Sequence, residues 1–202
     1  MRNIVKRGAD FILSSIGLLI FAPVFLLIIL AVLMEDGRPV FFMQERVGKS
    51  ARRIKLIKFR TMKYNGLQPH LFIDMLDSDP RTTKAGRILR ATAMDELPQL
   101  INIIKGDMSF VGPKPLPYRI EDEDKTKYQY LDQVPGYGER IKMLPGLTGI
   151  AQIFAPKTAS REEKFRFDNM YLQKQSLFYD IKLILISFFI TLNAKWESRE
   201  KL

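Results

Sequence analysis

The sequence contains no cysteine and only one histidine among its 202 residues. The lack of cysteine excludes disulfides and thiolate metal ligands. A single histidine cannot form a histidine-rich zinc site, and it would have to be the sole base of any Ser/His triad. This residue, His70, follows Gly66 and Pro69 in a polar stretch, and we expect it to be an ordinary loop or surface residue.

Acidic side chains are scarce relative to basic ones. The chain has 22 Asp and Glu against 32 Lys and Arg, which gives a net charge of +10. Such an excess favours an anionic partner, and the candidates are nucleic acid, phosphorylated small molecules and an anionic membrane surface. The length favours a single domain, residues 1–202, that is large enough to bury a hydrophobic core.

A long apolar run extends from Phe11 to Met34. It is interrupted only by Ser14, Ser15, Gly17 and Pro23. The run exceeds the ~20 residues that a membrane-spanning helix needs. It is too long for a secretory signal peptide, and no small-residue cleavage site follows it cleanly. The alternatives are a spanning helix and a re-entrant one.

Two features favour re-entry into the membrane over residues 1–36. Pro23 lies near the middle of the run, where it removes a backbone hydrogen bond and kinks the helix, and Ser14 or Ser15 could compensate nearby. Positive charge flanks both ends: Arg2, Lys6 and Arg7 before the run, and Arg38, Arg46, Lys49, Arg52 and Arg53 after it. The positive-inside tendency would keep both flanks cytoplasmic. A single span with a proline kink stays the alternative.

Two adjacent carboxylates, Asp95 and Glu96, stand at what we interpret as a helix start. Pro98 suits the first turn of a helix, and apolar residues then recur at helical spacing before Lys105 and a terminal Gly106. The positive end of the helix dipole would favour the ionised carboxylates. They could simply cap the helix, or they could form a nucleophile with an acidic neighbour that binds metal or moves a proton.

Strands are predicted at Val40–Met43 and Ile54–Phe59, joined as a hairpin. We expect most of the cations on this hairpin to face anionic lipid headgroups, whereas Lys58 and Arg60 would face a ligand. A helix over Lys84–Arg90, capped by Thr82 or Thr83, would direct Arg90 toward Asp95.

Four further predictions cover the remaining chain. A short helix is expected around residues 71–76, and the acidic run of residues 121–124 is interpreted as a solvated helix start. Ser160 and Glu163 form a capping box for a helix that ends near Gln173. The apolar segment Leu177–Trp196 is interpreted as an interfacial helix with Trp196 as a headgroup-level anchor, with a core helix as the alternative. The fold class is therefore mixed α/β, mostly helical, with a small β-hairpin.

Four motifs in one order carry a family resemblance. They are Lys58-Phe59-Arg60-Thr61-Met62, Asp95-Glu96-Leu97-Pro98-Gln99-Leu100, Gly106-Asp107-Met108-Ser109-Phe110-Val111-Gly112-Pro113 and Pro145-Gly146-Leu147-Thr148-Gly149. With these motifs the chain resembles the monotopic phosphoglycosyl transferases, also called bacterial sugar transferases or undecaprenyl-phosphate sugar phosphotransferases. The resemblance extends from the first helix to near the C-terminus and matches the minimal short form.

The resemblance implies a reaction. The family transfers a phospho-sugar from a UDP-sugar to a polyprenol phosphate, which gives UMP and a polyprenyl diphosphate sugar, in the first membrane step of cell-surface glycan or glycoprotein biosynthesis. It implies Asp95 as the nucleophile of a covalent aspartyl intermediate, Glu96 as its partner, Mg²⁺ as the cofactor and both carboxylates as metal ligands. It also implies that the first helix is re-entrant and breaks at Pro23. The protein is expected on the cytoplasmic face of the inner membrane.

Six residues are assigned to substrate binding: Lys58, Arg60, Arg90, Lys114, Gln152 and Asp168. Two positions depart from the family pattern. Lys114 replaces the frequent Arg of Gly-Pro-Arg-Pro and loses its bidentate fork, and Leu144 replaces an Arg before the Pro-Gly motif. The expected partners are a UDP-sugar, a polyprenol phosphate and an anionic membrane surface, with homo-oligomers possible and nucleic acid not expected. A membrane-anchored nucleic-acid-binding module or an adaptor without catalysis would leave the Asp95–Pro113 block without a purpose.

Overall fold

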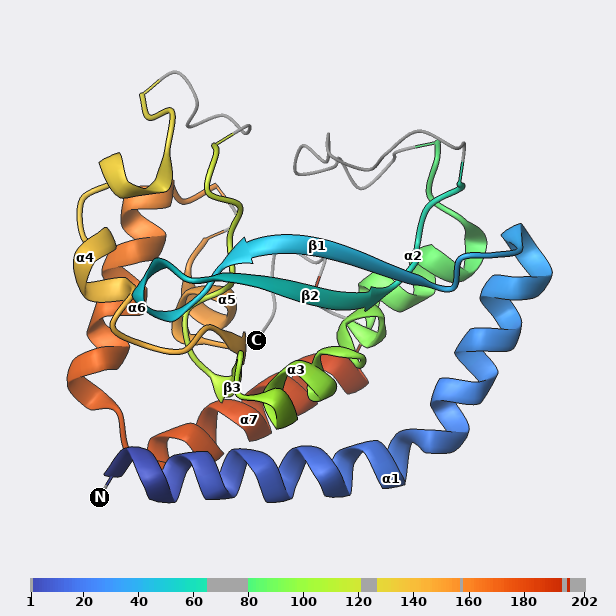
Figure 1. The fold of residues 1–202 in the computed structure, drawn as a ribbon, viewed down its shortest axis with the longest axis horizontal. Coiled ribbons are helices and arrows are strands. Elements are labelled where there is room, and N and C mark those ends of the chain that lie inside the picture. Colours follow the sequence, from blue (N-terminus) through green and yellow to red (C-terminus); the bar gives the residue numbers. More distant parts are fainter. Residues whose placement is uncertain (1, 65–79, 121–126, 157, 194–195, 197–202) are drawn as a thin grey trace.

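The computed structural model describes residues 2–64, 80–120, 127–156, 158–193 and 196. Its first element is helix α1, Arg2–Asp36, which contains Pro23. Figure 1 shows that α1 is bent: its first part runs along one edge of the molecule near α7, and its second part turns and rises toward the hairpin. Within the described residues, Ile4–Asp36 is the one stretch of helix long and apolar enough to cross a membrane. The prediction of one long apolar helix is confirmed.

The two serines of α1 do not compensate for Pro23. Pro23 leaves the carbonyl of Leu19, four residues earlier, without its helical donor. The hydroxyl of Ser14 instead donates to the carbonyl of Asp10 at 2.7 Å, and that of Ser15 donates to Phe11 at 2.8 Å. This expectation was wrong because a serine side chain reaches back only one turn, to its own i−4 carbonyl.

An antiparallel hairpin of β1, Phe41–Val47, and β2, Arg53–Phe59, follows α1. Its register pairs Phe41 with Phe59 and Val47 with Arg53, and a short 3₁₀ turn, Lys49–Ala51, joins the strands. The hairpin is confirmed, but β1 continues four residues beyond the predicted Met43. The added residues Gln44, Glu45 and Arg46 are polar, so hydrophobic alternation did not reveal this part of the strand.

Helix α2, Lys84–Ala91, starts as predicted. The hydroxyl of Thr83 accepts a hydrogen bond from the backbone nitrogen of Gly86 at 2.9 Å. Helix α3, Gln99–Lys105, ends at Gly106, which adopts a left-handed conformation with φ of 89°. Its N-cap is Pro98, so the two carboxylates lie before α3, in a separate 3₁₀ turn, and the predicted helix start at Asp95 and Glu96 is corrected to Gln99.

Strands β3, Ser109–Val111, and β4, Gly146–Thr148, form a short parallel pair that the sequence did not predict. Two glycines make it possible. A Cβ on Gly112 would lie 2.3 Å from the carbonyl oxygen of Leu144, and one on Gly146 would lie 2.1 Å from the nitrogen of Gly112. These motif glycines therefore allow two backbones to approach each other.

The C-terminal half supplies short helices and two long ones. They are a 3₁₀ turn at Leu131–Gln133, α4 at Tyr137–Arg140, α5 at Ile150–Phe154, α6 at Arg161–Lys174 and α7 at Leu177–Leu192. The capping box of α6 is confirmed, because Ser160 and Glu163 exchange hydrogen bonds between side chain and backbone. His70, the helix at residues 71–76 and the acidic run at residues 121–124 lie outside the described residues.

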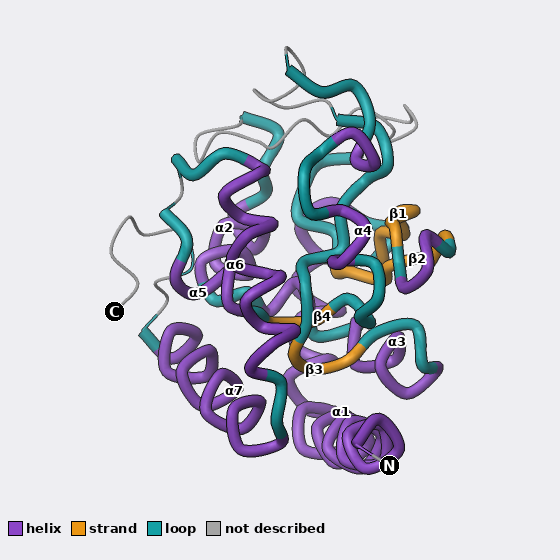
Figure 2. The backbone as a smooth tube through the Cα atoms, turned by 90° about the vertical axis from the view of Figure 1, so that its left-hand side faces the viewer, coloured by secondary structure: helices purple, strands orange, loops and turns teal. Residues whose placement is uncertain are grey.

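Helix α7 is both a core helix and an apolar surface. Leu183 and Ile190 are buried in a cluster with Val111 and Tyr171, whereas Leu185 and Phe189 are each 62% exposed. Figure 2 shows α7 and α1 together at one side of the molecule, with the strands and α2 to α6 on the other. The indole of Trp196 packs against this cluster and donates to the hydroxyl of Thr191, so its role as a membrane anchor stays a prediction.

Candidate active site

The two carboxylates lie in a tight turn, Met94–Glu96, between α2 and α3. The turn begins at Ala93, whose φ of 53° places a non-glycine residue in the left-handed region. Such a conformation costs of the order of 1 kcal/mol or more and persists only where the surroundings enforce it. The strained turn holds Asp95 and Glu96 side by side, with side-chain exposures of 13% and 18%.

Lys58, near the end of β2, is the closest cation to the pair. Its Nζ lies 2.5 Å from Oε1 of Glu96 and 3.9 Å from Oδ2 of Asp95. Burial disfavours the charge on Lys58, but the two carboxylates outweigh it and raise the pKa of this lysine above its ordinary value. Lys58 therefore lies at the carboxylate pair, and its predicted contact with a ligand stays a prediction.

The two carboxyl groups differ in their titration. Burial raises the pKa of Asp95 to about 6, with the charge of Glu96 adding to the shift and that of Lys58 opposing it. Burial also acts on Glu96, but Lys58 and Lys114 outweigh it and hold the pKa of this carboxyl below its ordinary value. Glu96 is therefore the carboxyl group held as an anion, and Asp95 is the more basic of the two.

Gln99, which the sequence analysis missed, completes the surroundings of Glu96. Its side-chain amide donates to the Glu96 carboxylate, which lowers the pKa of Glu96, and it is 1% exposed at the start of α3. Helix α3 also buries Asn102, and the burial of either side chain cannot be read from the sequence, so no sequence signal distinguished Gln99.

Arg90 and Lys114 add positive charge around the pair. Both cations act on Asp95 electrostatically and oppose the rise of its pKa. Nε of Arg90, in the last turn of α2, donates to the hydroxyl of Thr61 at 3.1 Å, which ties this cation to the segment after β2. The structure thus gathers three of the six assigned substrate-binding residues around the carboxylates.

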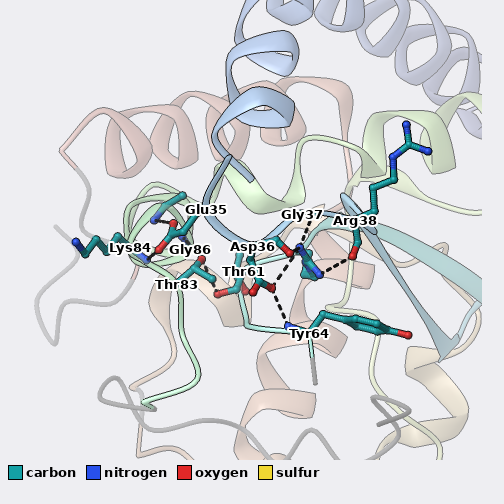
Figure 3. A network of polar contacts seen from close by, with 11 residues as sticks. Glu35, Asp36, Gly37, Arg38, Thr61, Tyr64, Thr83, Lys84 and Gly86 are labelled. Atoms are coloured by element: carbon teal, nitrogen blue, oxygen red, sulfur yellow. Dashed lines mark hydrogen bonds and ion pairs between the residues drawn. The ribbon is translucent and has the colours of Figure 1, made fainter. Parts of the chain in front are cut away.

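Arg60 is not among them. Its guanidinium is buried and donates to the carbonyls of Asp36 at 2.9 Å and Gly37 at 2.7 Å, at the C-terminal end of α1. Figure 3 labels the two acceptor residues, Asp36 and Gly37. In the same network the Glu35 carboxylate accepts the backbone N–H groups of Lys84 and Ala85, at the N-terminus of α2. We therefore revise the role of Arg60: it joins α1 to the segment that carries the site.

Asp168 and Gln152 also bond to residues other than the two carboxylates. Oδ2 of Asp168 accepts from Nε of Arg140 at 2.9 Å, with both side chains 4% exposed, and burial raises the pKa of this carboxyl. Asp168 is thus a buried partner of Arg140 and not a free ligand for substrate. Gln152 donates to the carbonyl of Leu147 at 3.1 Å, within its own segment, and its binding role stays a prediction.

The carboxylate oxygens of Asp95 and Glu96 suit a hard cation that takes its remaining ligands from elsewhere. Among the described residues, no group of three or more His, Cys, Asp or Glu side chains converges as a ready metal cage. Mg²⁺ is commonly bound through one or two carboxylates together with substrate phosphates. Asp95 and Glu96 could supply those carboxylates, so the residues fit a magnesium ion that arrives with a phosphorylated substrate.

Comparison with known proteins gives the family. The model of the bacterial sugar transferase family matches residues 1–194. Exopolysaccharide production protein ExoY of Rhizobium meliloti (strain 1021) is 37% identical over 196 residues, covering 90% of this chain and 83% of that protein. The UDP-glucose:undecaprenyl-phosphate glucose-1-phosphate transferase of Escherichia coli (strain K12) is 36% identical over 194 residues, covering 94% of this chain and 40% of that protein. The chain therefore belongs to the bacterial sugar transferase family.

Proposed function

We propose that this protein transfers a phospho-sugar from a UDP-sugar to undecaprenyl or a related polyprenol phosphate, with UMP as the second product. The observation that carries the proposal is a basic carboxylate, Asp95, held beside an ionised Glu96 and surrounded by Lys58, Arg90 and Lys114. Relatives named for transfer of glucose 1-phosphate or N-acetylgalactosamine phosphate to undecaprenyl phosphate support the substrate class.

The first step uses Asp95 as the nucleophile. A carboxylate oxygen attacks the phosphorus that bears the sugar, a new O–P bond forms, and the bond from this phosphorus to the UMP oxygen breaks. The diphosphate is strongly anionic, so attack by a second anion requires compensation. Fixed positive charges on Lys58, Arg90 and Lys114 would stabilise the charge that develops on the transferring and leaving oxygens.

The second step regenerates Asp95. An oxyanion of the polyprenol phosphate attacks the aspartyl phosphorus, the bond to the carboxylate breaks, and the diphosphate product forms. In the first step, Mg²⁺ held by Asp95 and Glu96 would neutralise phosphate charge and make UMP a better leaving group. Glu96, kept in place by Lys58 and Gln99, would hold its position through both steps.

We propose a re-entrant course for α1, on the cytoplasmic face of the inner membrane. Both ends of α1 contact the same folded domain. Near its start, Arg7 donates to the carbonyls of Ile103 and Ile104 at the end of α3, and at its end Asp36 is held by Arg60. A domain on one side of a membrane can hold both ends of a helix only if that helix returns to the same side.

The apolar surfaces suit this arrangement. The most exposed large side chains of α1 include Leu19 at 78% and Met34 at 85%, and those of α7 include Phe178 at 81%. Large apolar side chains exposed on two helices suit a membrane contact. Placement of α7 at the interface would put the active site at headgroup depth, where a polyprenol phosphate presents its phosphate.

The test is UMP release from a panel of UDP-sugars by purified protein, with and without polyprenol phosphate and Mg²⁺. We expect one or a few sugars to give a polyprenyl diphosphate sugar and stoichiometric UMP. Absence of UMP and of lipid product with every sugar in the panel would overturn the proposal.

A further inference from the structure

The loop that carries Lys114 is fixed from both sides by backbone contacts. The nitrogen of Gly112 donates to Thr148 at 2.9 Å, and the nitrogen of Gly146 donates to Pro113 at 2.9 Å. After the loop, the nitrogen of Val47 donates to the carbonyl of Leu116 at 2.9 Å. Pro113 and Pro115 are both buried, whereas Lys114 between them is exposed. The loop is therefore an anchored segment that presents one cation.

The carbonyl of Lys114 itself is held by Arg140. Nη2 of Arg140 donates to this oxygen, Nε donates to Oδ2 of Asp168 at 2.9 Å, and the guanidinium lies 4.6 Å from the centroid of the Phe165 ring. Arg140 and Asp168 are each almost fully buried, at 4% and 3% exposure. One planar group thus connects a carboxylate on α6 to the backbone at the base of the Lys114 side chain.

A second contact from the same helix reaches the start of the loop. Tyr171 lies three residues after Asp168, on the same face of α6. Its hydroxyl donates to Asp180 at 2.5 Å and lies 3.3 Å from the carbonyl oxygen of Val111. Helix α6 therefore contacts the loop at two points, directly at Val111 and through Arg140 at Lys114.

We infer that Arg140 and Asp168 are positioning residues that act through Lys114 in the transfer reaction. A lysine ammonium is a point charge on a flexible stem and lacks the fork by which an arginine fixes its own direction on a phosphate. Its position relative to Asp95 and Glu96 therefore depends on where its backbone is held. The inference rests on the proposed function, since it assigns these two residues a part in the same site.

The test must remove the Arg140–Asp168 ion pair without unfolding the protein. Loss of one partner would leave a buried charge unpaired and strongly destabilise the fold, whereas replacement of both by apolar side chains is often neutral. The double variant Arg140→Met with Asp168→Leu meets this requirement, and Met can still pack on Phe165. Glu162→Gln is the control, because it removes the ion pairs of Glu162 with Lys127 and Arg166 on the solvent side of the same helix.

We expect kcat of the double variant to fall about tenfold or more, since a small displacement of a catalytic charge has effects of this size. The control variant should keep the parent kcat. In a Lys114→Met background, the double substitution should change kcat less than twofold, because the cation it positions is already gone. A full additional loss in that background would overturn the inference, as would an unchanged kcat in the double variant.

Amide hydrogen exchange provides a readout that does not depend on the reaction. We expect faster exchange at the amides of Val47 and Gly146, which bond to the loop on either side of Lys114, and unchanged exchange in α3 and β2. A uniform rise over the whole protein would mean a purely structural role and would overturn the inference. If the unaltered protein releases no UMP, the proposed function fails, whatever the exchange pattern shows.

Discussion

The ammonium of Lys58 donates to Oε1 of Glu96 at 2.5 Å, and this contact distinguishes the two carboxylates of the site. Glu96 is paired and ionised, whereas Asp95 is 3.9 Å from the same ammonium and has a pKa raised to about 6 by burial. The pairing explains how adjacent carboxylates on one short turn could take different roles, one as a fixed charge and one as a nucleophile.

Asp95→Asn should fold normally and lose all transfer, because an amide cannot form the covalent intermediate. The measurement is UMP release by purified variant, with mass spectrometry of the Asp95 peptide as a control against deamidation. Near-normal turnover in a sample free of deamidation would contradict the role of Asp95 as the nucleophile.

The same variant should be more stable than the parent above pH 6. The pKa of Asp95 rises from 3.8 to about 6 on folding, so the native state binds more protons than the unfolded state between these values and loses stability as pH rises through them. Asp95→Asn removes this penalty, which we expect to raise the free energy of unfolding at pH 7.5 by about 1–3 kcal/mol in metal-free protein. Chemical denaturation at pH 7.5 and at pH 3.5 checks the sign, since the gain should vanish at the lower pH.

Lys58→Met should lower kcat about a hundredfold, because it removes a fixed charge beside the reacting phosphate and leaves Glu96 without its closest cation. It should also raise the pKa of Glu96, since Lys58 is the largest cause that lowers it. Lys55→Met is the matched control: Lys55 lies on the same strand, three residues earlier, and is exposed. Equal losses in the two variants would mean that hairpin charge in general, and not Lys58, supports the reaction.

Local signals predicted much of this fold. The hairpin, the Thr83 cap of α2 and the Ser160–Glu163 box of α6 each depend on residues close together in sequence, and each is present. The β3–β4 pair was missed because it joins two three-residue strands far apart in the chain, and such strands carry no periodicity.

The site was predicted less completely, for a similar reason. The motifs contain Asp95, Glu96 and Lys58, but they do not reveal which charged residues pair with each other in the core. Asp168 is separated from Arg140 by 28 positions, and Arg60 from Asp36 by 24. Buried charges need partners, and only the folded chain shows whether a motif residue uses its charge on substrate or on another residue.

Topology can be tested in this cysteine-free background with single substitutions Asn3→Cys and Arg52→Cys. We expect both to be labelled by a membrane-impermeant thiol reagent only from the cytoplasmic side, because both ends of α1 contact one domain. Lys142→Cys, on the exposed surface of the catalytic part, is the cytoplasmic control. Labelling of Asn3→Cys from the periplasmic side alone would mean that α1 spans the membrane.

The kinetic order should follow from the charges at the site. A ternary complex would bring a UDP-sugar diphosphate and a polyprenol phosphate together around one carboxylate pair and three cations, and the repulsion between these anions would be large. Transfer through Asp95 avoids this, because UMP can leave before the lipid phosphate enters. We therefore expect ping-pong kinetics, with UMP released in an amount up to that of the enzyme before any polyprenol phosphate is added. A phospho-sugar adduct should then be present on the peptide that contains Asp95, and adding polyprenol phosphate should remove it. Intersecting double-reciprocal plots without a UMP burst or an adduct would favour direct transfer and would leave Asp95 as a metal ligand only.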